Sequence, residues 1–407
     1  MAAHHDFLIA LMVTSPFSCA ASDGDARTTP GTASFAETSP ALGDPLPGLT
    51  VSERARFAAG RDAFEEVESV SDGLGPVFND VSCAACHLQG AIGGASARTV
   101  TRFGRVSGGA FDPLAELGGS LIQSQGIGPI TSGGQTCDYV AERVPAQANV
   151  VAMRLTTPLF GLGLVDAVPD ATLVALAARQ AADSPATAGR VNLVSNVVTG
   201  TLTVGKLGWK AQVPSLAQFA ADAYLNEMGI TSPLFPHENC PGGDCKLLAC
   251  DPTPDPEDDG TDTRAFADFM MLLAPPARST THGQTIPGER IFGQIGCAAC
   301  HVPALTTGSS AIAALDRVTF APYSDFLLHD MGMSGDGIAQ GQAGVRDMRT
   351  APLWGLRARG VFLHDGSATS VTAAIVAHDG QGRAARDRFA ALPAGQSKLV
   401  LAFLASL

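Results

Sequence analysis

Aromatic side chains are scarce in this sequence, whose 407 residues include two Trp, three Tyr and 19 Phe. Charged residues make up only 16%, and 39 acidic residues outnumber 26 basic ones, so the net charge is −13. Nucleic-acid binding requires a basic surface, so this composition excludes it. Long hydrophobic runs are also lacking, because the apolar stretch at residues 7–17 is too short to cross a bilayer as a helix. The composition therefore predicts a globular protein with no membrane span.

Residues 1–19 predict a signal or lipoprotein-like segment, because the run at 7–17 has the length of a signal-peptide core. No Lys or Arg precedes this run, which departs from the usual positive start. Cys19 is a candidate for a lipid anchor. Residues 20–49 are rich in Ser, Thr, Pro and small residues and predict a disordered leader. We therefore expect a bacterial protein that is exported to the periplasm or the cell envelope.

The motif Cys-x-x-Cys-His occurs twice, at residues 83–87 and 297–301. Two thiols separated by two residues match the two vinyl groups of one porphyrin, and the adjacent His reaches the iron from the same side. The motifs predict two covalently bound haem c groups, which would supply the flat apolar mass that aromatic side chains usually provide. The predicted attachment residues are Cys83, Cys86, Cys297 and Cys300, and the predicted iron ligands are His87 and His301.

The remaining cysteines favour an oxidising compartment. If Cys19 is set aside, an even set is left, which favours two disulfides, although the pairing cannot be read from the sequence. This set consists of Cys137, Cys240, Cys245 and Cys250. The alternative is a zinc site made by His237 and the last three cysteines, but their spacing is wider than in common zinc knuckles.

An internal repeat links the two motifs, because Gly60 and Phe64 precede the first as Gly288 and Phe292 precede the second. This repeat predicts a duplicated helix that packs its Phe against a haem face. We expect a mainly α fold with two cytochrome c-like haem domains, the first with a large insertion that contains some β-structure. The predicted domains are residues 50–278 and 279–407. Helices are expected from Ser52, with Phe57, Phe64 and Val67 inward, and over 170–182, 215–228, 264–273, 371–377 and 386–407, and a strand pair is expected over 191–207.

Three segments near the C-terminus carry a family resemblance: Arg349–Gly355 (RTAPLWG), Phe362–Gly366 (FLHDG) and Ala374–Gly380 (AIVAHDG). Together with them, the chain over residues 50–407 resembles the peroxidase-like di-haem oxidoreductases. These belong to the superfamily of bacterial di-haem cytochrome c peroxidases and of the enzyme that matures the tryptophan tryptophylquinone cofactor. Further matching segments are Gly208–Leu216, Met228–Thr231, Leu272–Arg278 and Pro322–Gly332.

The resemblance implies a distal ligand for the second haem. In this superfamily the ligand lies fourteen residues past the His of the His-Asp-Gly motif, where the peroxidases have Met and the quinone-maturing enzyme has Tyr. Fourteen residues past His364 lies His378, and Met331 and Met333 are the alternatives. Ligation by two histidines lowers a haem's potential relative to Met/His ligation, so the second haem is expected to have a lowered potential.

Other site residues are implied by the same segments. The turn at His364 implies a calcium ion held by backbone carbonyls, although Arg359 and Val361 stand where the peroxidases have Thr and Pro. Trp354 is a candidate electron relay, with core packing as the alternative interpretation. Candidate partners for the haem propionates are Arg346 and Arg349, because buried carboxylates need fixed cationic donors.

The distal side of the first haem is not identified by the sequence. The acidic residue of the relatives has no counterpart at a matching place, and the candidates Glu142, Arg143 and Arg154 are chosen only from their position before residues 158–164. The lack of a nearby His or Met indicates an open iron position.

The expected function is that of an exported, peroxidase-like di-haem oxidoreductase. It would activate peroxide or oxygen at the His87 haem, with electron transfer through the His301 haem. Alternatives are a pure electron-transfer cytochrome and an oxidative modifier of a partner protein. The expected partner is a small redox protein such as a cytochrome or a cupredoxin.

Overall fold

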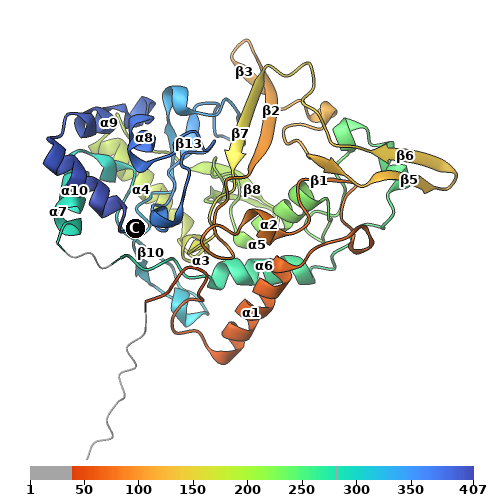
Figure 1. The fold of residues 1–407 in the computed structure, drawn as a ribbon, viewed down its shortest axis with the longest axis horizontal. Coiled ribbons are helices and arrows are strands. Elements are labelled where there is room, and N and C mark those ends of the chain that lie inside the picture. Colours follow the sequence, from red (N-terminus) through yellow and green to blue (C-terminus); the bar gives the residue numbers. More distant parts are fainter. Residues whose placement is uncertain (1–38, 280–282) are drawn as a thin grey trace, which may run out of the picture. The chain divides into compact units, whose positions relative to one another are not determined.

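A computed structural model describes residues 39–279 and 283–407 of the chain (Figure 1). Residues 39–407 form one compact unit. The predicted signal segment, the lipid anchor at Cys19 and most of the predicted leader lie outside the described residues. Within the described part, no helix is both long and apolar enough to cross a membrane.

The prediction of a mainly α fold is wrong. The described residues contain ten α-helices and also thirteen strands arranged in six small antiparallel sheets, so the fold is mixed α and β. The strands are not confined to an insertion, because β10 (Leu305–Thr306), β11 (Thr319–Phe320), β12 (Leu328–Asp330) and β13 (Asp347–Arg349) follow the second Cys-x-x-Cys-His motif. These strands are only two or three residues long, so they carry no alternating pattern that a sequence could reveal.

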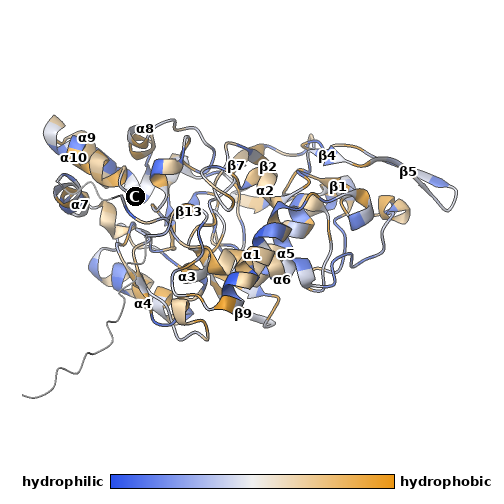
Figure 2. Ribbon diagram, turned by 60° about the horizontal axis from the view of Figure 1, so that its bottom comes forward, coloured by the Kyte–Doolittle hydropathy of each residue, from blue (hydrophilic) through white to orange (hydrophobic). Residues whose placement is uncertain are grey.

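Helix α1 (Val51–Glu65) opens the described fold and packs against α6 (Thr261–Leu272). It begins with a capping box between Thr50 and Glu53, rather than at Ser52 as predicted. Phe57 and Phe64 are buried as predicted, whereas Val67 lies beyond the helix and is exposed. In Figure 2 both hydrophilic and hydrophobic residues colour α1, as expected for a helix with one buried face.

The two cysteines of the first motif lie on the single turn α2 (Cys83–Cys86), and most of the strands follow it in the sequence. In one sheet β2 (Thr99–Ser107) pairs with both β3 (Ala110–Asp112) and β7 (Val150–Leu155). The other pairs are β1 (Val77–Phe78) with β4 (Gln125–Gly126), β5 (Gly128–Ser132) with β6 (Gln135–Tyr139), and β8 (Asn192–Asn196) with β9 (Thr201–Gly205). The β5–β6 hairpin projects away from its neighbours in Figures 1 and 2, and β8–β9 confirms the predicted strand pair.

Most of the predicted helices are present. The helices before the closing segment are α3 (Leu162–Asp166), α4 (Asp170–Asp183), α5 (Leu216–Ala223), α6, α7 (Thr285–Gln294) and α8 (Val371–Val376). Helix α7 contains Gly288 and Phe292 and is the second copy of the helix predicted from the repeat, whereas α3 was not predicted. The predicted closing helix is two helices, α9 (Arg383–Ala390) and α10 (Ala394–Leu404), because Pro393 cannot continue a helix. Helix α5 continues as a π-helix, η3 (Tyr224–Met228).

Two disulfides join the four described cysteines outside the motifs, Cys137 with Cys250 and Cys240 with Cys245. The disulfide interpretation is thereby confirmed over the zinc alternative. The first bond ties β6 to the segment that precedes α6, and the second closes a short loop between them.

The repeated Gly and Phe make equivalent packing contacts in both halves of the chain. A side chain at Gly60 would overlap the backbone oxygen of Ala265 in α6, and one at Gly288 would overlap that of Leu399 in α10. Each glycine therefore allows a partner helix to approach closely. The Phe that follows lies near the motif histidine: the ring centres are 5.8 Å apart for Phe64 and His87 and 6.2 Å apart for Phe292 and His301.

Candidate functional site

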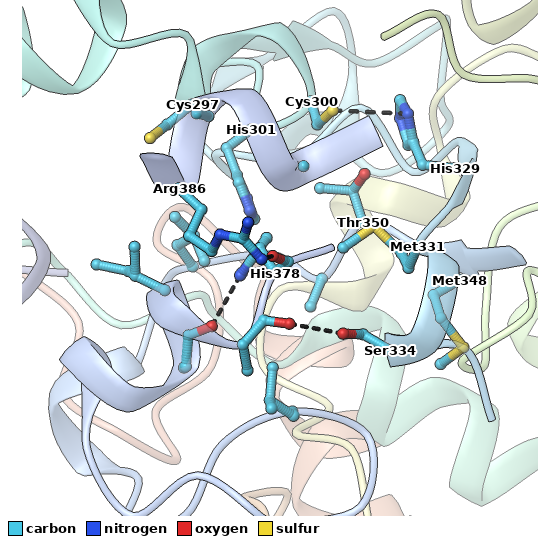
Figure 3. A pocket seen from close by; sticks show the side chains of 18 of the residues that line it. Cys297, Cys300, His301, His329, Met331, Ser334, Met348, Thr350, His378 and Arg386 are labelled. Carbon is cyan, nitrogen blue, oxygen red and sulfur yellow. Dashed lines mark hydrogen bonds between the residues drawn. The ribbon is translucent and has the colours of Figure 1, made fainter. Parts of the chain in front are cut away.

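Each Cys-x-x-Cys-His motif lies at the wall of its own cavity. The first cavity has a volume of about 180 Å³ and the second of about 220 Å³. The residues of the two motifs that line them are Cys83, Cys86 and His87 in the first cavity, and Cys297, Cys300 and His301 in the second. The predicted distal ligand His378 also lines the second cavity (Figure 3).

His301 and His378 face each other across the second cavity with their ring centres 6.4 Å apart. A metal–imidazole nitrogen bond is about 2.0–2.1 Å long, so two imidazoles on opposite faces of one metal ion have ring centres about 6–6.5 Å apart. The separation therefore fits two axial ligands of one iron.

Backbone carbonyls fix the orientation of both rings. Nδ1 of His301 hydrogen-bonds the Tyr323 oxygen at 2.9 Å, and Nδ1 of His378 hydrogen-bonds the Ala374 oxygen at 2.8 Å. A proton on Nδ1 leaves Nε2 with a free lone pair, which is the arrangement of most metal-bound histidines. Burial, together with the neighbouring His378, lowers the pKa of His301 to about 4, and burial also lowers the pKa of His378. Both rings are therefore neutral and able to bind a metal.

The two methionines proposed as alternative ligands differ in position. Met331 lines the second cavity, whereas Met333 is 92% exposed and does not line it. His378 is the side chain found opposite His301.

The first cavity has a different set of lining residues. His87 hydrogen-bonds the Gly94 oxygen through Nδ1 at 3.2 Å, and burial lowers its pKa to about 4. No second histidine is present among the described residues that line this cavity. Instead, Asp222 and Glu227 line it from the end of α5 and from η3, together with Arg102 from β2.

Glu227 is a buried acidic residue of this cavity wall that the sequence analysis did not single out. Burial raises its pKa to about 6, although Arg102 and a hydrogen bond from Asn79 act in the opposite direction. The amide of Asn79 donates to Oε2 at 2.8 Å. Glu227 directly precedes the matched segment Met228–Thr231, but interpreting 215–228 as a regular helix could not show which face it occupies. The π-helical turn, a feature frequent at functional sites, sets that face.

The three candidates that the sequence offered for the distal side of the first haem either do not line the cavity or are held in an ion pair. Glu142 accepts backbone hydrogen bonds from Gln123 and Gly242 and does not line the cavity, and Arg143 does not line it either. Arg154 does line the cavity, but its guanidinium is paired with Asp336 at 2.6 Å.

A model of the family described as "Di-haem oxidoreductase, putative peroxidase" matches residues 133–407, more than half of the chain. The chain belongs to this family. Haem is accordingly the cofactor of this di-haem oxidoreductase, and the second motif lies inside the matched region while the first precedes it.

Two solved structures are similar to the oxidoreductase at low identity. Hydrazine synthase of Kuenenia stuttgartiensis is 14% identical with a TM-score of 0.38, and the match covers 94% of this chain and 100% of that chain. A MauG-like protein associated with microbial copper homeostasis is 17% identical with a TM-score of 0.32, and the match covers 65% of this chain and 92% of that chain. No curated protein matches the sequence.

Trp209 lines both cavities of the di-haem oxidoreductase. Its indole nitrogen donates to the Leu155 oxygen at 2.8 Å, and its ring centre lies 6.3 Å from that of His364. Trp354, the residue predicted as a relay, packs against Phe320 and is not among the described residues that line either cavity. The sequence contains only these two tryptophans and offered no signal that separates them.

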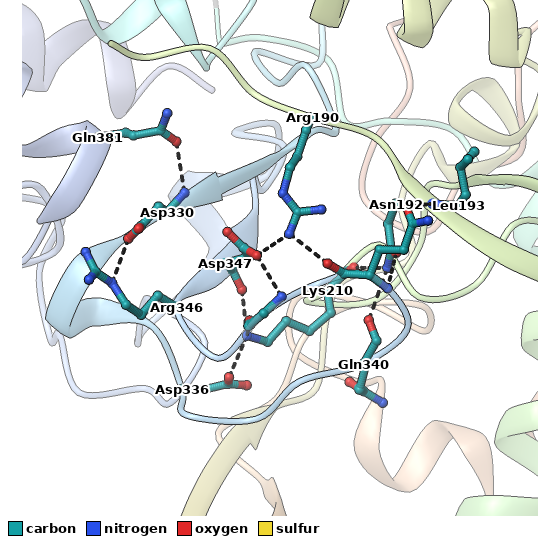
Figure 4. Close-up of polar contacts among 12 residues, drawn as sticks. Arg190, Asn192, Leu193, Lys210, Asp330, Asp336, Gln340, Arg346, Asp347 and Gln381 are labelled. Atoms are coloured by element: carbon teal, nitrogen blue, oxygen red, sulfur yellow. Dashed lines mark hydrogen bonds and ion pairs between the residues drawn. The ribbon is translucent and has the colours of Figure 1, made fainter. Parts of the chain in front are cut away.

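A buried ion cluster fixes the segment that carries Trp209. Asp336 accepts from Lys210 at 2.7 Å and pairs with Arg154, and all three side chains are buried. Nζ of Lys210 also donates to the backbone oxygen of Asp347 at 2.6 Å (Figure 4). A buried charge is stable only when it is paired in this way, so the cluster ties the Trp209 segment to β7 and to the segment between β12 and β13.

A second buried pair lies beside the second motif. His329 approaches the Cys300 sulfur at 3.5 Å through Nδ1 (Figure 3) and the Asp325 carboxylate at 2.9 Å through Nε2. Burial alone would lower the pKa of His329, but the bonds to Asp325 and Cys300 raise it to about 10.

The arginines near the second cavity differ from one another. Arg349, a predicted partner of the haem propionates, lines the cavity and donates to the backbone oxygens of Gly208 and Thr350. Arg346 pairs with Asp330 on the surface and is not among the lining residues. Arg359 lines the cavity, and its Nε and Nη2 atoms are buried without a hydrogen-bond partner. An orphaned cation beside two facing imidazoles fits a cofactor that carries carboxylates, such as haem.

The predicted calcium site at Arg359 and Val361 stays a prediction. The group of acidic side chains that could hold a metal ion among the described residues lies in a different part of the chain. It consists of Glu238, Asp251, Asp255 and Glu257.

Proposed function

We propose that this di-haem oxidoreductase is an exported c-type cytochrome that reduces peroxide in the first cavity with electrons that pass through the second. The observation that carries the proposal is the difference between the two cavities. The second has a neutral imidazole on each side, which leaves no place for a substrate at an iron. The first has an imidazole on one side and a buried carboxyl group, Glu227, in its wall.

The covalent attachment predicted from the motifs is part of this proposal. The four motif thiols would form thioether bonds with two haems, and His87, His301 and His378 would bind the irons. Haem iron, when bound, supplies the one-electron chemistry that the side chains of this chain lack.

Glu227 would move the protons of the reaction. Reduction of hydrogen peroxide to two molecules of water consumes two electrons and two protons. A carboxyl group with a pKa near 6 can take a proton from the bound peroxide and return it to the departing oxygen at neutral pH. Oε2 is occupied by the Asn79 amide, so we assign this transfer to Oε1. The positive charge of Arg102 in the same wall would favour the developing anion.

The route of the electrons is proposed from the position of Trp209, which lines both cavities. The donor would be a small redox protein, a cytochrome or a cupredoxin. Export to an oxidising compartment is supported by the two disulfides.

The test is the spin state of the purified di-haem protein with and without hydrogen peroxide. We expect one high-spin ferric haem that reacts rapidly with peroxide and one low-spin haem, and turnover when a reduced cytochrome is supplied. Two low-spin haems that are inert to peroxide would instead establish a pure electron carrier. Reaction with peroxide without turnover of a cytochrome, but with covalent change in a partner protein, would establish an oxidative modifier.

A further inference from the structure

The wall of the second cavity is cationic, although the chain as a whole carries a net charge of −13. Among the described residues that line this cavity there is no Asp or Glu. The lining arginines are Arg349, Arg359, Arg386 and Arg388. The first cavity, in contrast, is lined by both acidic and basic residues.

Three of these four arginines have partners within the protein, and Arg349 donates to the backbone oxygens of Gly208 and Thr350. Arg386 pairs with Asp387 at 2.8 Å and donates to the His378 oxygen at 2.9 Å. Arg388 donates from Nε to the Ile295 oxygen at 2.8 Å. Their positions are therefore explained by contacts within the protein.

Arg359 differs from these three, because its guanidinium carbon lies 5.9 Å from the centre of the Phe362 ring, which provides no hydrogen bond. Its Nε and Nη2 atoms are buried and unpartnered, and burial lowers the pKa of its guanidinium to about 10 without any contribution from a carboxylate. A buried charge without a partner is strongly unfavourable, so a fold that keeps one there implies an anion from outside the chain.

The position of Arg349 and Arg359 indicates on which side of the second cavity this anion would lie. Arg349 and Arg359 line a small space of about 20 Å³ that is bordered as well by Thr157 and Trp209, two residues of the first cavity wall. The two guanidinium groups are therefore on the side of the second cavity that faces the first.

We propose that Arg359, together with Arg349, binds a propionate carboxylate of the haem in the second cavity and thereby raises the reduction potential of that haem. A guanidinium group binds a carboxylate with two parallel hydrogen bonds. Its positive charge stabilises the reduced iron more than the oxidised iron, which offsets part of the decrease in potential caused by two imidazole ligands. The proposal rests on the proposed function only in placing a haem between His301 and His378.

The experiment is a potentiometric titration of the holoprotein, followed in the absorption bands of each haem. In Arg359→Met the midpoint potential of the second haem should shift to a more negative value while that of the first haem changes less. Arg359→Lys, which keeps the charge but not the paired hydrogen bonds, should restore part of the shift. Arg357→Met is the matched control, because it removes an exposed arginine two residues away and should leave both potentials unchanged.

A second measurement is independent of potential. The propionate bending bands of the second haem in the resonance Raman spectrum should shift in Arg359→Met and not in Arg357→Met. If Arg359→Met is folded and fully loaded with haem but both the potential and these bands equal those of the wild type, the proposal is wrong. Peroxide reactivity does not enter either measurement, so the failure of the proposed function and the failure of this inference are separable.

Discussion

At the scale of single residues, His378 is the proposed distal ligand of the second haem. In His378→Ala the second haem should lose its low-spin bis-imidazole spectrum, because the ring 6.4 Å from His301 is removed. Absorption and electron paramagnetic resonance spectra would measure the change, and the first haem should be unaffected. Met331→Leu alters another lining residue of the same cavity and should leave the spectrum unchanged. If only Met331→Leu changed the spectrum, Met331 would be the ligand.

Glu227 gives a prediction for pH dependence. Burial raises its pKa to about 6 from the ordinary value near 4.5, and the ionised form is needed to accept a proton from peroxide. The rate constant for the reaction of the resting protein with peroxide should therefore rise through pH 6 and reach a plateau above it. Glu227→Gln should lower the plateau by about 10²–10⁴-fold and abolish the pH dependence.

The control for this prediction is Glu142→Gln, a change at a partly buried carboxyl group that does not line the first cavity. It should keep both the rate constant and its pH profile. If the pH profile persists in Glu227→Gln, the proton transfer belongs to another group. Asp80 and Asp222 are the other acidic residues that line the described cavity.

At the scale of elements, two glycines of α7 offer a test position and a control position for the packing of α7 against α10. In Gly288→Ala the new methyl group would overlap the Leu399 backbone oxygen, so we expect a loss of about 1–3 kcal/mol in the free energy of unfolding. A methyl group at Gly293 would meet no atom within 4 Å, so Gly293→Ala should be neutral or stabilise the helix by up to about 1 kcal/mol. Denaturant unfolding of both variants checks the pair, and equal stabilities would contradict close packing at Gly288.

The elements also show which features of the fold a sequence can predict. Helices α4 and α6 and the strand pair β8–β9 have a clear apolar period and were predicted within a few residues. Strands β10 to β13 were not, because two or three residues cannot display a period and form only where the chain folds back on itself. The change from α to π geometry in η3 depends on tertiary packing rather than on local propensity.

The candidate site was predictable to a similar extent. The Cys-x-x-Cys-His motif identified lining residues with a fixed local spacing, such as Cys297 and His301. The spacing known from the family identified His378 as a further lining residue. Glu227, Trp209 and Arg359 line the cavities because segments distant in the sequence bring them there, and their roles are proposals. One glutamate, tryptophan or arginine looks like another in the sequence, so their roles required the structure.

At the scale of the whole molecule, the proposed function requires electrons to pass between two cavities with different lining residues. Trp209 lines both of them and Trp354 lines neither among the described residues, although the two indoles are similarly buried, at 8% and 5% exposed. The chain thus contains its own matched control for the role of an indole between the haems.

In Trp209→Phe we expect electron transfer between the haems to slow by at least about tenfold, which corresponds to about 1.4 kcal/mol in the activation barrier. An indole passes one electron more readily than a phenyl ring, and the Leu155 hydrogen bond that orients it would also be lost. Pulse radiolysis adds one electron per protein, and the absorption bands of the two haems report its movement. Trp354→Phe should leave this rate unchanged, with both haem spectra intact in both variants. Equal rates in the two variants would show that the electron crosses between the cavities without the help of Trp209.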